Sequence, residues 1–167
     1  MAPNASFDVT STIDFQEVDN ALNQARKEVA QRYDFKGAAA DIDLNRPEKT
    51  LTLTAESELK MNALWEIVQM RLVKRGVAVK NFKAGESQPA AGDTVRRVIE
   101  IQQGIPIEAA REIVKFIKDQ KLKKVQAAIQ ADQVRVSSPS KDELQLAMHL
   151  LREHDFGIAL QFGNYRS

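Results

Sequence analysis

The feature that most limits the possible folds of this chain is a repeated order of expected elements. A strand, a helix, a hairpin, a helix and a strand occur once in each half of the 167 residues, with a period of about 88 residues between Phe7 and Val95. This order is typical of two split βαβ units, each with two helices on one face of a four-stranded antiparallel sheet. We therefore expect an α+β protein with two ferredoxin-like (βαββαβ) domains.

Hydrophobic periodicity supports each of these elements. Strands are predicted where apolar residues alternate with polar ones, as at Phe7 and Val9, and helices where apolar residues recur every three or four positions. Asp14 and Ser140 stand where helix N-caps are expected. The segment Lys83–Asp93 has two glycines, one proline and no periodicity, so we expect an inter-domain loop there. The predicted domains span residues 12–92 and 103–167.

Composition excludes several classes of protein. Hydrophobic residues make up 43% of the chain, and 24 Lys and Arg against 23 Asp and Glu give a net charge of +1, which disfavours a tight binder of duplex DNA. The longest stretch without a charged side chain, residues 156–165, is too short to cross a membrane. The chain has no cysteine and no signal-peptide pattern at its N-terminus, so we expect a cytoplasmic protein.

Sequence signatures of enzymes and metal sites are missing. No phosphate-binding glycine motif occurs, and His149 and His154 are five residues apart, whereas two zinc ligands on one helix face are usually four apart. We therefore expect no catalytic residues, no metal and no cofactor.

A polar sheet face in the second domain is the feature most suggestive of binding. Opposite the apolar positions of its strands lie Gln126, Gln130, Gln133, Arg135, Ser137 and Gln161. Glutamine and arginine can hydrogen-bond the edges of nucleobases, and lysines at 121, 123 and 124 precede the first of these strands. The same pattern also fits a plain solvated face, because the middle strands lack the aromatic residues typical of RNA-binding domains of this architecture.

Six strings occur along the chain in a fixed order: Ser-Phe-Asp-Val at 6–9, Arg-Tyr-Asp-Phe-Lys-Gly at 32–37, Lys-Val-Gln-Ala-Ala-Ile-Gln at 124–130, Gln-Val-Arg-Val at 133–136, Lys-Asp-Glu-Leu-Gln at 141–145 and Leu-Gln-Phe-Gly-Asn-Tyr-Arg at 160–166. Together they resemble the bacterial YajQ family over essentially the whole chain. The resemblance implies a tandem of RNP-like, ferredoxin-like domains whose N-terminal strands are exchanged. The strand at 6–11 would then complete the second domain, and the strand at 94–102 the first.

The resemblance also implies a function. Members of the family are described as nucleotide-binding proteins linked to GTP, ATP and tRNA, and some as cyclic di-GMP effectors that act with a transcription regulator. No enzymatic activity is associated with the family.

Candidate binding residues follow from chemistry at the matching positions. Tyr33, Phe35 and Tyr165 are predicted to stack on bases, and Lys36, Arg135 and Arg166 to bind phosphate or guanine edges. The amides of Gln126, Gln130 and Gln161 complete the predicted nucleotide site. Phe35 also fits a core position, because a turn between a helix and a strand commonly buries its aromatic residue.

Two functions are consistent with these observations. The first is a non-enzymatic protein that binds a guanine nucleotide, most sharply cyclic di-GMP, and signals through a protein partner. The alternative is an RNA-binding protein for tRNA or single strands. The dependence of affinity on salt separates them, because RNA held through several phosphates loses affinity steeply as salt rises.

Overall fold

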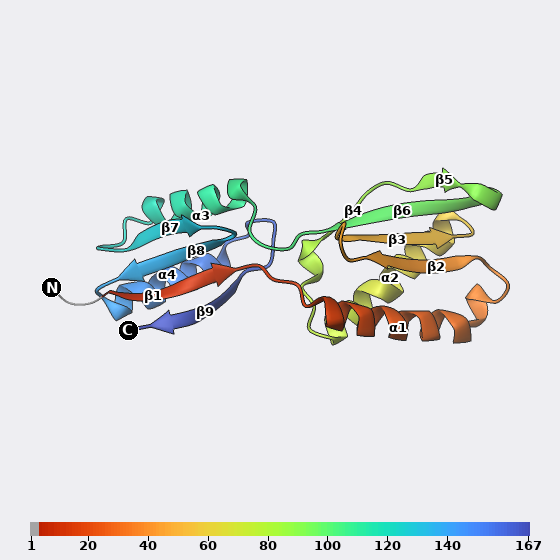
Figure 1. Ribbon diagram of the computed structural model, residues 1–167, viewed down its shortest axis with the longest axis horizontal. Coiled ribbons are helices and arrows are strands. Elements are labelled where there is room, and N and C mark those ends of the chain that lie inside the picture. Colours follow the sequence, from red (N-terminus) through yellow and green to blue (C-terminus); the bar gives the residue numbers. More distant parts are fainter. Residues whose placement is uncertain (1–3) are drawn as a thin grey trace. The chain divides into compact units, whose positions relative to one another are not determined.

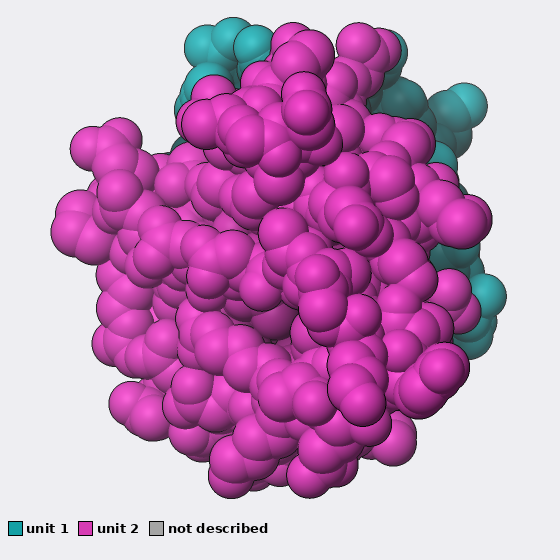
Figure 2. All heavy atoms as spheres, turned by 90° about the vertical axis from the view of Figure 1, so that its right-hand side faces the viewer, with its two compact units in different colours: residues 1–12, 103–167 teal, residues 13–102 magenta. Residues whose placement is uncertain are grey.

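The computed structural model describes residues 4–167 as two compact units (Figures 1 and 2). Unit 1 contains residues 103–167 together with the N-terminal segment up to Thr12, and unit 2 contains residues 13–102. Residues 1–3, part of the N-terminal stretch used for the localisation prediction, lie outside the described residues. Both units combine helices with an antiparallel sheet, so the expected α+β class is confirmed.

Unit 1 is built on a four-stranded sheet with the order β7-β8-β1-β9 (Figure 1). Its elements are β1 (Ala5–Thr10), α3 (Ile107–Asp119), β7 (Gln126–Gln130), β8 (Gln133–Ser138), α4 (Lys141–Glu153) and β9 (Gln161–Arg166). The first strand of the chain is therefore a middle strand of this sheet, paired with β8 on one side and β9 on the other.

Unit 2 is built on a sheet with the order β2-β3-β6-β4, to which β5 adds a further pairing with β6. Its elements are α1 (Phe15–Gln31), β2 (Ala40–Asn45), β3 (Thr50–Ala55), α2 (Glu58–Lys74), β4 (Phe82–Ala84), β5 (Gln88–Ala90) and β6 (Thr94–Ile101). The sheet has five strands, so the prediction of four strands in each domain is wrong for this unit.

The extra strand lies in the segment that we predicted to be an inter-domain loop. Both β4 and β5 pair with β6, and the chain passes between the units after Thr12 and after Gln102 instead. The prediction failed because Pro89 and the lack of alternation hid a short strand. Proline is compatible with a strand at the edge of a sheet, where its missing N–H is not needed.

Each unit has its own hydrophobic core between its helices and one face of its sheet. In unit 1, Phe7 and Val9 are fully buried against Val134 and Val136, and α3 and α4 cover them with residues such as Ile113. In unit 2, buried residues of β3, β6, α1 and α2 meet in the same way. The opposite face of each sheet, which we call its open face, carries mostly polar side chains that are half-buried or exposed, apart from Ser6 and Asp8 in unit 1, which are buried. No helix within residues 4–167 is long and apolar enough to span a membrane.

Side-chain caps fix where the helices begin. The Asp14 carboxylate accepts from the backbone N–H groups of Gln16 and Glu17 at the start of α1, and the Ser140 hydroxyl accepts from Glu143 at the start of α4. These caps satisfy N–H groups that have no partner within the helix. Both caps were predicted. At the start of α2 the Ser57 hydroxyl accepts from the N–H of Lys60 and forms a third cap.

Candidate functional site

The open face of unit 1 is ordered into three rows that run across the sheet. Directly opposite residues on neighbouring strands share a face, so the register defines each row. The first row is Gln126, Ser137, Ser6 and Arg166; the second is Ala128, Arg135, Asp8 and Gly163; the third contains Gln130 and Gln133 on one side and Thr10 and Gln161 on the other. Five predicted binding residues therefore lie on one face: Gln126, Gln130, Arg135, Gln161 and Arg166.

An ion pair between Asp8 and Arg135 lies at the centre of the open face. Arg135 Nε donates to Asp8 Oδ1 over 2.9 Å, and a second guanidinium nitrogen donates to Oδ2 over 3.4 Å. Asp8 is only 5% exposed, whereas the Arg135 side chain keeps 28% of its surface accessible. The pair holds the guanidinium in one orientation beside the sheet.

Hydrogen bonding controls the ionisation of this pair. The Arg135 guanidinium lowers the pKa of the Asp8 carboxyl below its ordinary value, although burial acts in the opposite direction. A 2.6 Å hydrogen bond from Asn164 Nδ2 to Asp8 Oδ2 lowers it further. The same contact raises the pKa of Arg135. Asp8 is therefore a carboxylate with three hydrogen bonds, and Arg135 is a fixed cation.

Asn164 reaches Asp8 because β9 is irregular there. Its φ of 53° is left-handed, a conformation that asparagine adopts more readily than most residues, and the pairing of β9 with β1 shifts register between Ser6 and Asp8. The irregularity breaks the alternation of side chains along the strand. Asn164 consequently contacts the open face, while Tyr165 does not.

Tyr165, predicted to stack on a base, packs on the helix side of the sheet. Its ring centroid lies 6.4 Å from that of Phe7, a core residue, and its hydroxyl donates to the Met148 sulfur of α4 over 3.2 Å. Tyr165 is 57% exposed, but its ring is not on the face that carries Arg135.

A hollow of about 380 Å³ lies on the open face beside Asp8. It is lined by Asp8, Thr10, Gln133, Gln161, Phe162, Gly163 and Asn164. Glycine leaves room here, since a Cβ at position 163 would meet no heavy atom within 4 Å. We call this cavity the Gly163 hollow.

The side-chain amide of Gln161 is hydrogen-bonded to Thr12, in the chain segment that leaves unit 1. Its Oε1 accepts from the Thr12 N–H over 2.9 Å and from the Thr12 hydroxyl over 2.6 Å, while its Nε2 donates to the Thr12 carbonyl over 3.1 Å. The amide thus pairs with Thr12 much as a neighbouring strand would. In this structure Gln161 lines the hollow but uses its polar atoms to hold Thr12.

The remaining predicted residues, Tyr33, Phe35 and Lys36, lie in unit 2 and not with the other six. Tyr33 is 88% exposed on a short 3-10 helix after α1, and Lys36 is also exposed. Phe35 is only 4% exposed and belongs to the core of unit 2. Its ring is flanked by the cations of Arg32 and Lys60, 5.7 Å and 5.4 Å from its centroid.

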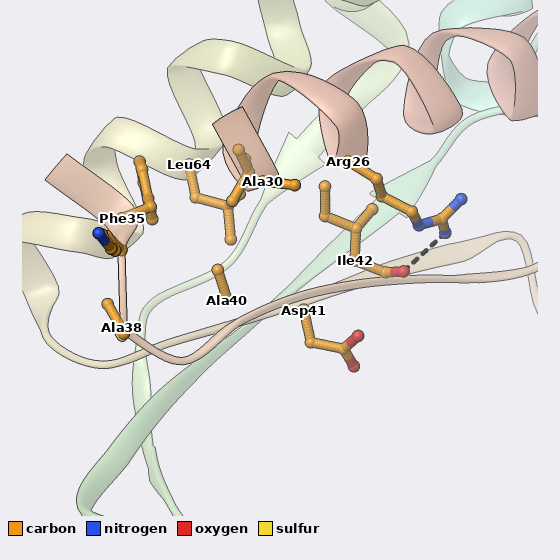
Figure 3. Close-up of a pocket in the computed structure, with 11 residues that line it drawn as sticks. Arg26, Ala30, Phe35, Ala38, Ala40, Asp41, Ile42 and Leu64 are labelled. Atoms are coloured by element: carbon orange, nitrogen blue, oxygen red, sulfur yellow. Dashed lines mark hydrogen bonds between the residues drawn. The ribbon is translucent and has the colours of Figure 1, made fainter. Parts of the chain in front are cut away.

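Phe35 and Lys36 also line a second cavity, of about 410 Å³, between α1 and β2 (Figure 3). Arg26 of α1 crosses one end of it and donates to the backbone carbonyl of Ile42 over 2.7 Å. We call this cavity the α1–β2 groove.

Residues 4–167 contain no group of three or more His, Cys, Asp or Glu side chains that could hold a metal ion. His154 instead packs against the rings of Phe116 and Phe156, with centroid distances of 4.6 Å and 4.5 Å.

Comparison with known proteins identifies the family. A family model described as "Nucleotide-binding protein YajQ-like" matches residues 5–166. The chain belongs to this family. The protein from Solibacter usitatus is 49% identical to it, with 99% of both chains covered. Those from Carboxydothermus hydrogenoformans and Chloroherpeton thalassium are 46% and 44% identical, with 99% of this chain and 100% of theirs covered. Each relative is named a nucleotide-binding protein.

Three residues of the two candidate sites were not predicted from the sequence. Asp8 had a detectable signal, because it lies between the apolar residues Phe7 and Val9 and must therefore face away from the core. Asn164 had none, because its position depends on the irregularity in β9. Arg26 was hidden among the charged residues of an amphipathic helix.

Proposed function

We propose that this protein is a non-enzymatic, cytoplasmic nucleotide-binding protein whose ligand lies on the open face of unit 1. We further propose that the ligand is a guanine nucleotide, specifically cyclic di-GMP. The protein with its bound ligand would then contact a protein partner such as a transcription regulator. Membership of the YajQ-like family and the names of the relatives support nucleotide binding. We interpret the places of β1 and β6 as an exchange of first strands between two ferredoxin-like repeats.

The observation that carries the proposal is the guanidinium held by Asp8. A planar guanidinium can stack on a nucleobase, and a side chain that is already fixed loses less conformational entropy on binding. Ala128 and Gly163 flank the pair in the central row, so no large side chain of that row obstructs a flat ring. Arg135 would therefore stack on the base, as aromatic residues do in RNA-binding domains of this architecture.

The rows on either side of the pair provide groups that can read a guanine base. Guanine presents O6 and N7 as acceptors and its N2 amino group as a donor, and a glutamine amide has one group of each kind. Gln126 and Gln130 are exposed in the outer rows. Arg166 lies in the first row, where its charge suits a phosphate.

The test is an equilibrium titration with labelled cyclic di-GMP, competed by unlabelled GTP and by tRNA, at low and at physiological salt. We expect saturable binding that resists salt. Arg135→Lys keeps the charge but loses the plane and the bidentate contact, so we expect affinity to fall about tenfold or more. Arg96→Lys, on an exposed strand residue of unit 2, is the matched control. If Arg135→Ala and Arg166→Ala bind as well as the parent protein, the assignment of the site is wrong.

Gly163→Ala gives an independent test of the hollow. The new methyl group meets no atom within 4 Å, and the residue is outside the left-handed region, so the variant should fold normally. Replacing glycine within a strand typically stabilises it by roughly 0.5–1 kcal/mol. Weaker nucleotide binding by a protein that is equally or more stable would locate the ligand at the hollow; unchanged affinity would exclude contact there.

One observation favours the alternative of RNA binding. Lys121, Lys123 and Lys124 are exposed in the loop that leads into β7, at the border of the open face. Several phosphates held there would make the affinity fall steeply with salt. Binding that is displaced by tRNA and abolished at physiological salt would support this alternative and contradict the effector proposal.

A further inference from the structure

The α1–β2 groove of unit 2 is a cavity that the nucleotide proposal does not use; it is lined by apolar residues of α1, α2 and β2 and by the charged residues Arg26, Lys36 and Asp41. Figure 3 shows Ala30 and Leu64 on the helix side, with Ala38, Ala40 and Ile42 along the strand side. Three of these five residues are alanines. Because helices and sheets normally meet through large side chains, this run of alanines leaves the space of about 410 Å³ unfilled.

The backbone of β2 is available along this groove. Within the described residues 4–167, β2 is the outer strand of its sheet and pairs with β3 alone. The N–H of Glu56 donates to the Ala39 carbonyl, which therefore points toward β3, while the Ile42 carbonyl points outward to Arg26. In an antiparallel pair both backbone groups of a residue point to the same side, and alternate residues point to opposite sides. The N–H and C=O groups of Ala40 and Ile42 thus point away from β3, to the outer edge of the sheet, where the Ile42 carbonyl accepts from Arg26.

The charges at the rim favour an acidic ligand. Arg26 lies at one end of the groove, and Lys36 is exposed beside Gly37 at the other. Asp41 also lies at the rim, but its carboxylate is directed away from the cavity (Figure 3). A ligand that paired with the Ile42 carbonyl would release the Arg26 guanidinium, which could then bind a carboxylate.

We propose that the α1–β2 groove binds an extended segment of a partner protein, which adds a strand to the outer edge of β2. The partner residue opposite Ala40 would point to the same side of the sheet as Ala40, into the cavity. A large apolar side chain at this partner position would fill the space that the alanines leave. An acidic side chain of the same segment pairs with Lys36 or Arg26. Arg26 protects the exposed edge in the absence of the partner, as charged residues commonly do.

Strand addition explains the groove better than a nucleotide does. Outward backbone groups recur at every second residue of β2, which matches the repeat of an extended peptide. A single base would satisfy one such donor and acceptor and leave the rest unused. The inference is independent of the nucleotide site, because all its residues lie in unit 2 and those of the nucleotide site lie in unit 1.

The test is selection from a phage library of random decapeptides, fused so that their C-termini are not free, on the immobilised full-length protein. We expect the enriched peptides to share a large apolar residue near an acidic one. Ala30→Leu fills the cavity from an exposed helix position and should weaken the best peptide about tenfold or more. Ala39→Leu is the matched control, because Ala39 belongs to the alternate residues whose side chains lie on the other face.

A charge reversal and hydrogen exchange complete the test. Lys36→Glu should weaken the peptide about fivefold, whereas Lys27→Glu on the outside of α1 should not. The amide protons of Ala40 and Ile42 should exchange quickly in the free protein and become protected when the peptide binds.

Three results would overturn the proposal. One is a selection that yields no peptide sensitive to Ala30→Leu. Another is a peptide that binds without protecting the Ala40 and Ile42 amides. The third is protection of these amides by GTP, or by raising the protein concentration alone, which would assign the groove to a nucleotide or to a second copy of the chain. Loss of nucleotide binding by Arg135→Lys would leave the groove proposal untouched.

Discussion

The ion pair at the centre of the open face predicts a stability change that depends on pH. Asp8→Asn keeps the shape of the side chain but removes its charge and places an amide group opposite donors from Arg135 and Asn164. Asp8 accepts three hydrogen bonds while 5% exposed. A hydrogen bond to a charged group contributes about 1.5–3 kcal/mol, and solvent access on the Arg135 side reduces the loss. We expect unit 1 to lose about 1–2 kcal/mol of unfolding free energy at pH 7.

The sign of the pH dependence follows from the lowered pKa of Asp8. In the unfolded chain this carboxyl titrates at about 3.9, so between that value and the lower folded value the unfolded state binds more protons. Stability from Asp8 is therefore fully present above the unfolded pKa and is lost as the pH falls through the folded pKa. The difference between wild type and Asp8→Asn should shrink below about pH 4, because a protonated carboxyl and an amide are both neutral.

The assay must report on unit 1 alone. Trp65, the single tryptophan, packs against the core of unit 2, so its fluorescence follows the other unit. Urea unfolding should instead be followed by the NMR signals of Val134 and Val136 at several pH values. Asp119→Asn, at an exposed position of α3, is the control for loss of one charge. A destabilisation that is equal at pH 7 and in acid, or no destabilisation at all, would refute the role assigned to Asp8.

Three further changes test contacts within each unit. Gln161→Ala should speed amide hydrogen exchange of Thr12 measured by NMR, because it removes the acceptor 2.9 Å from that N–H. Phe7→Ala removes a fully buried ring from the core of unit 1 and should cost about 3–5 kcal/mol in urea unfolding of that unit. Ser57→Ala removes the cap on the Lys60 N–H and should lower the stability of unit 2 by about 1 kcal/mol, as measured by tryptophan fluorescence.

Local signals were enough to predict most of the secondary structure. Alternation and helical periodicity located the long strands and all the described helices of more than one turn, and Asp14 and Ser140 were predicted as caps. β5 was missed because its three residues include Pro89 and it is stabilised only by pairing with β6. A strand that exists only through its neighbour leaves little trace in its own residues.

Part of the open face could also be predicted from the alternation of side chains along its strands. Strict alternation along β7 and β8 places Gln126, Gln130 and Arg135 on the side away from the core. Alternation fails in β9, where Asn164 is left-handed and the following residue, Tyr165, faces the helices. The partner of Arg135 was not predictable from local sequence, since Asp8 is 127 residues away along the chain.

The position of β1 links the fold to the proposed function. As a middle strand of unit 1, β1 supplies Asp8 to the open face and Phe7 to the core from the same six residues. Without it, β8 and β9 would each lose a neighbouring strand, and Arg135 would lack the carboxylate that holds its guanidinium. Residues 103–167 therefore contain most of the side chains of the proposed site but lack Asp8, which β1 supplies. The ion pair that holds the guanidinium exists only when β1 is in place, so the nucleotide binding that we propose at Arg135 would require a folded unit 1 that includes β1.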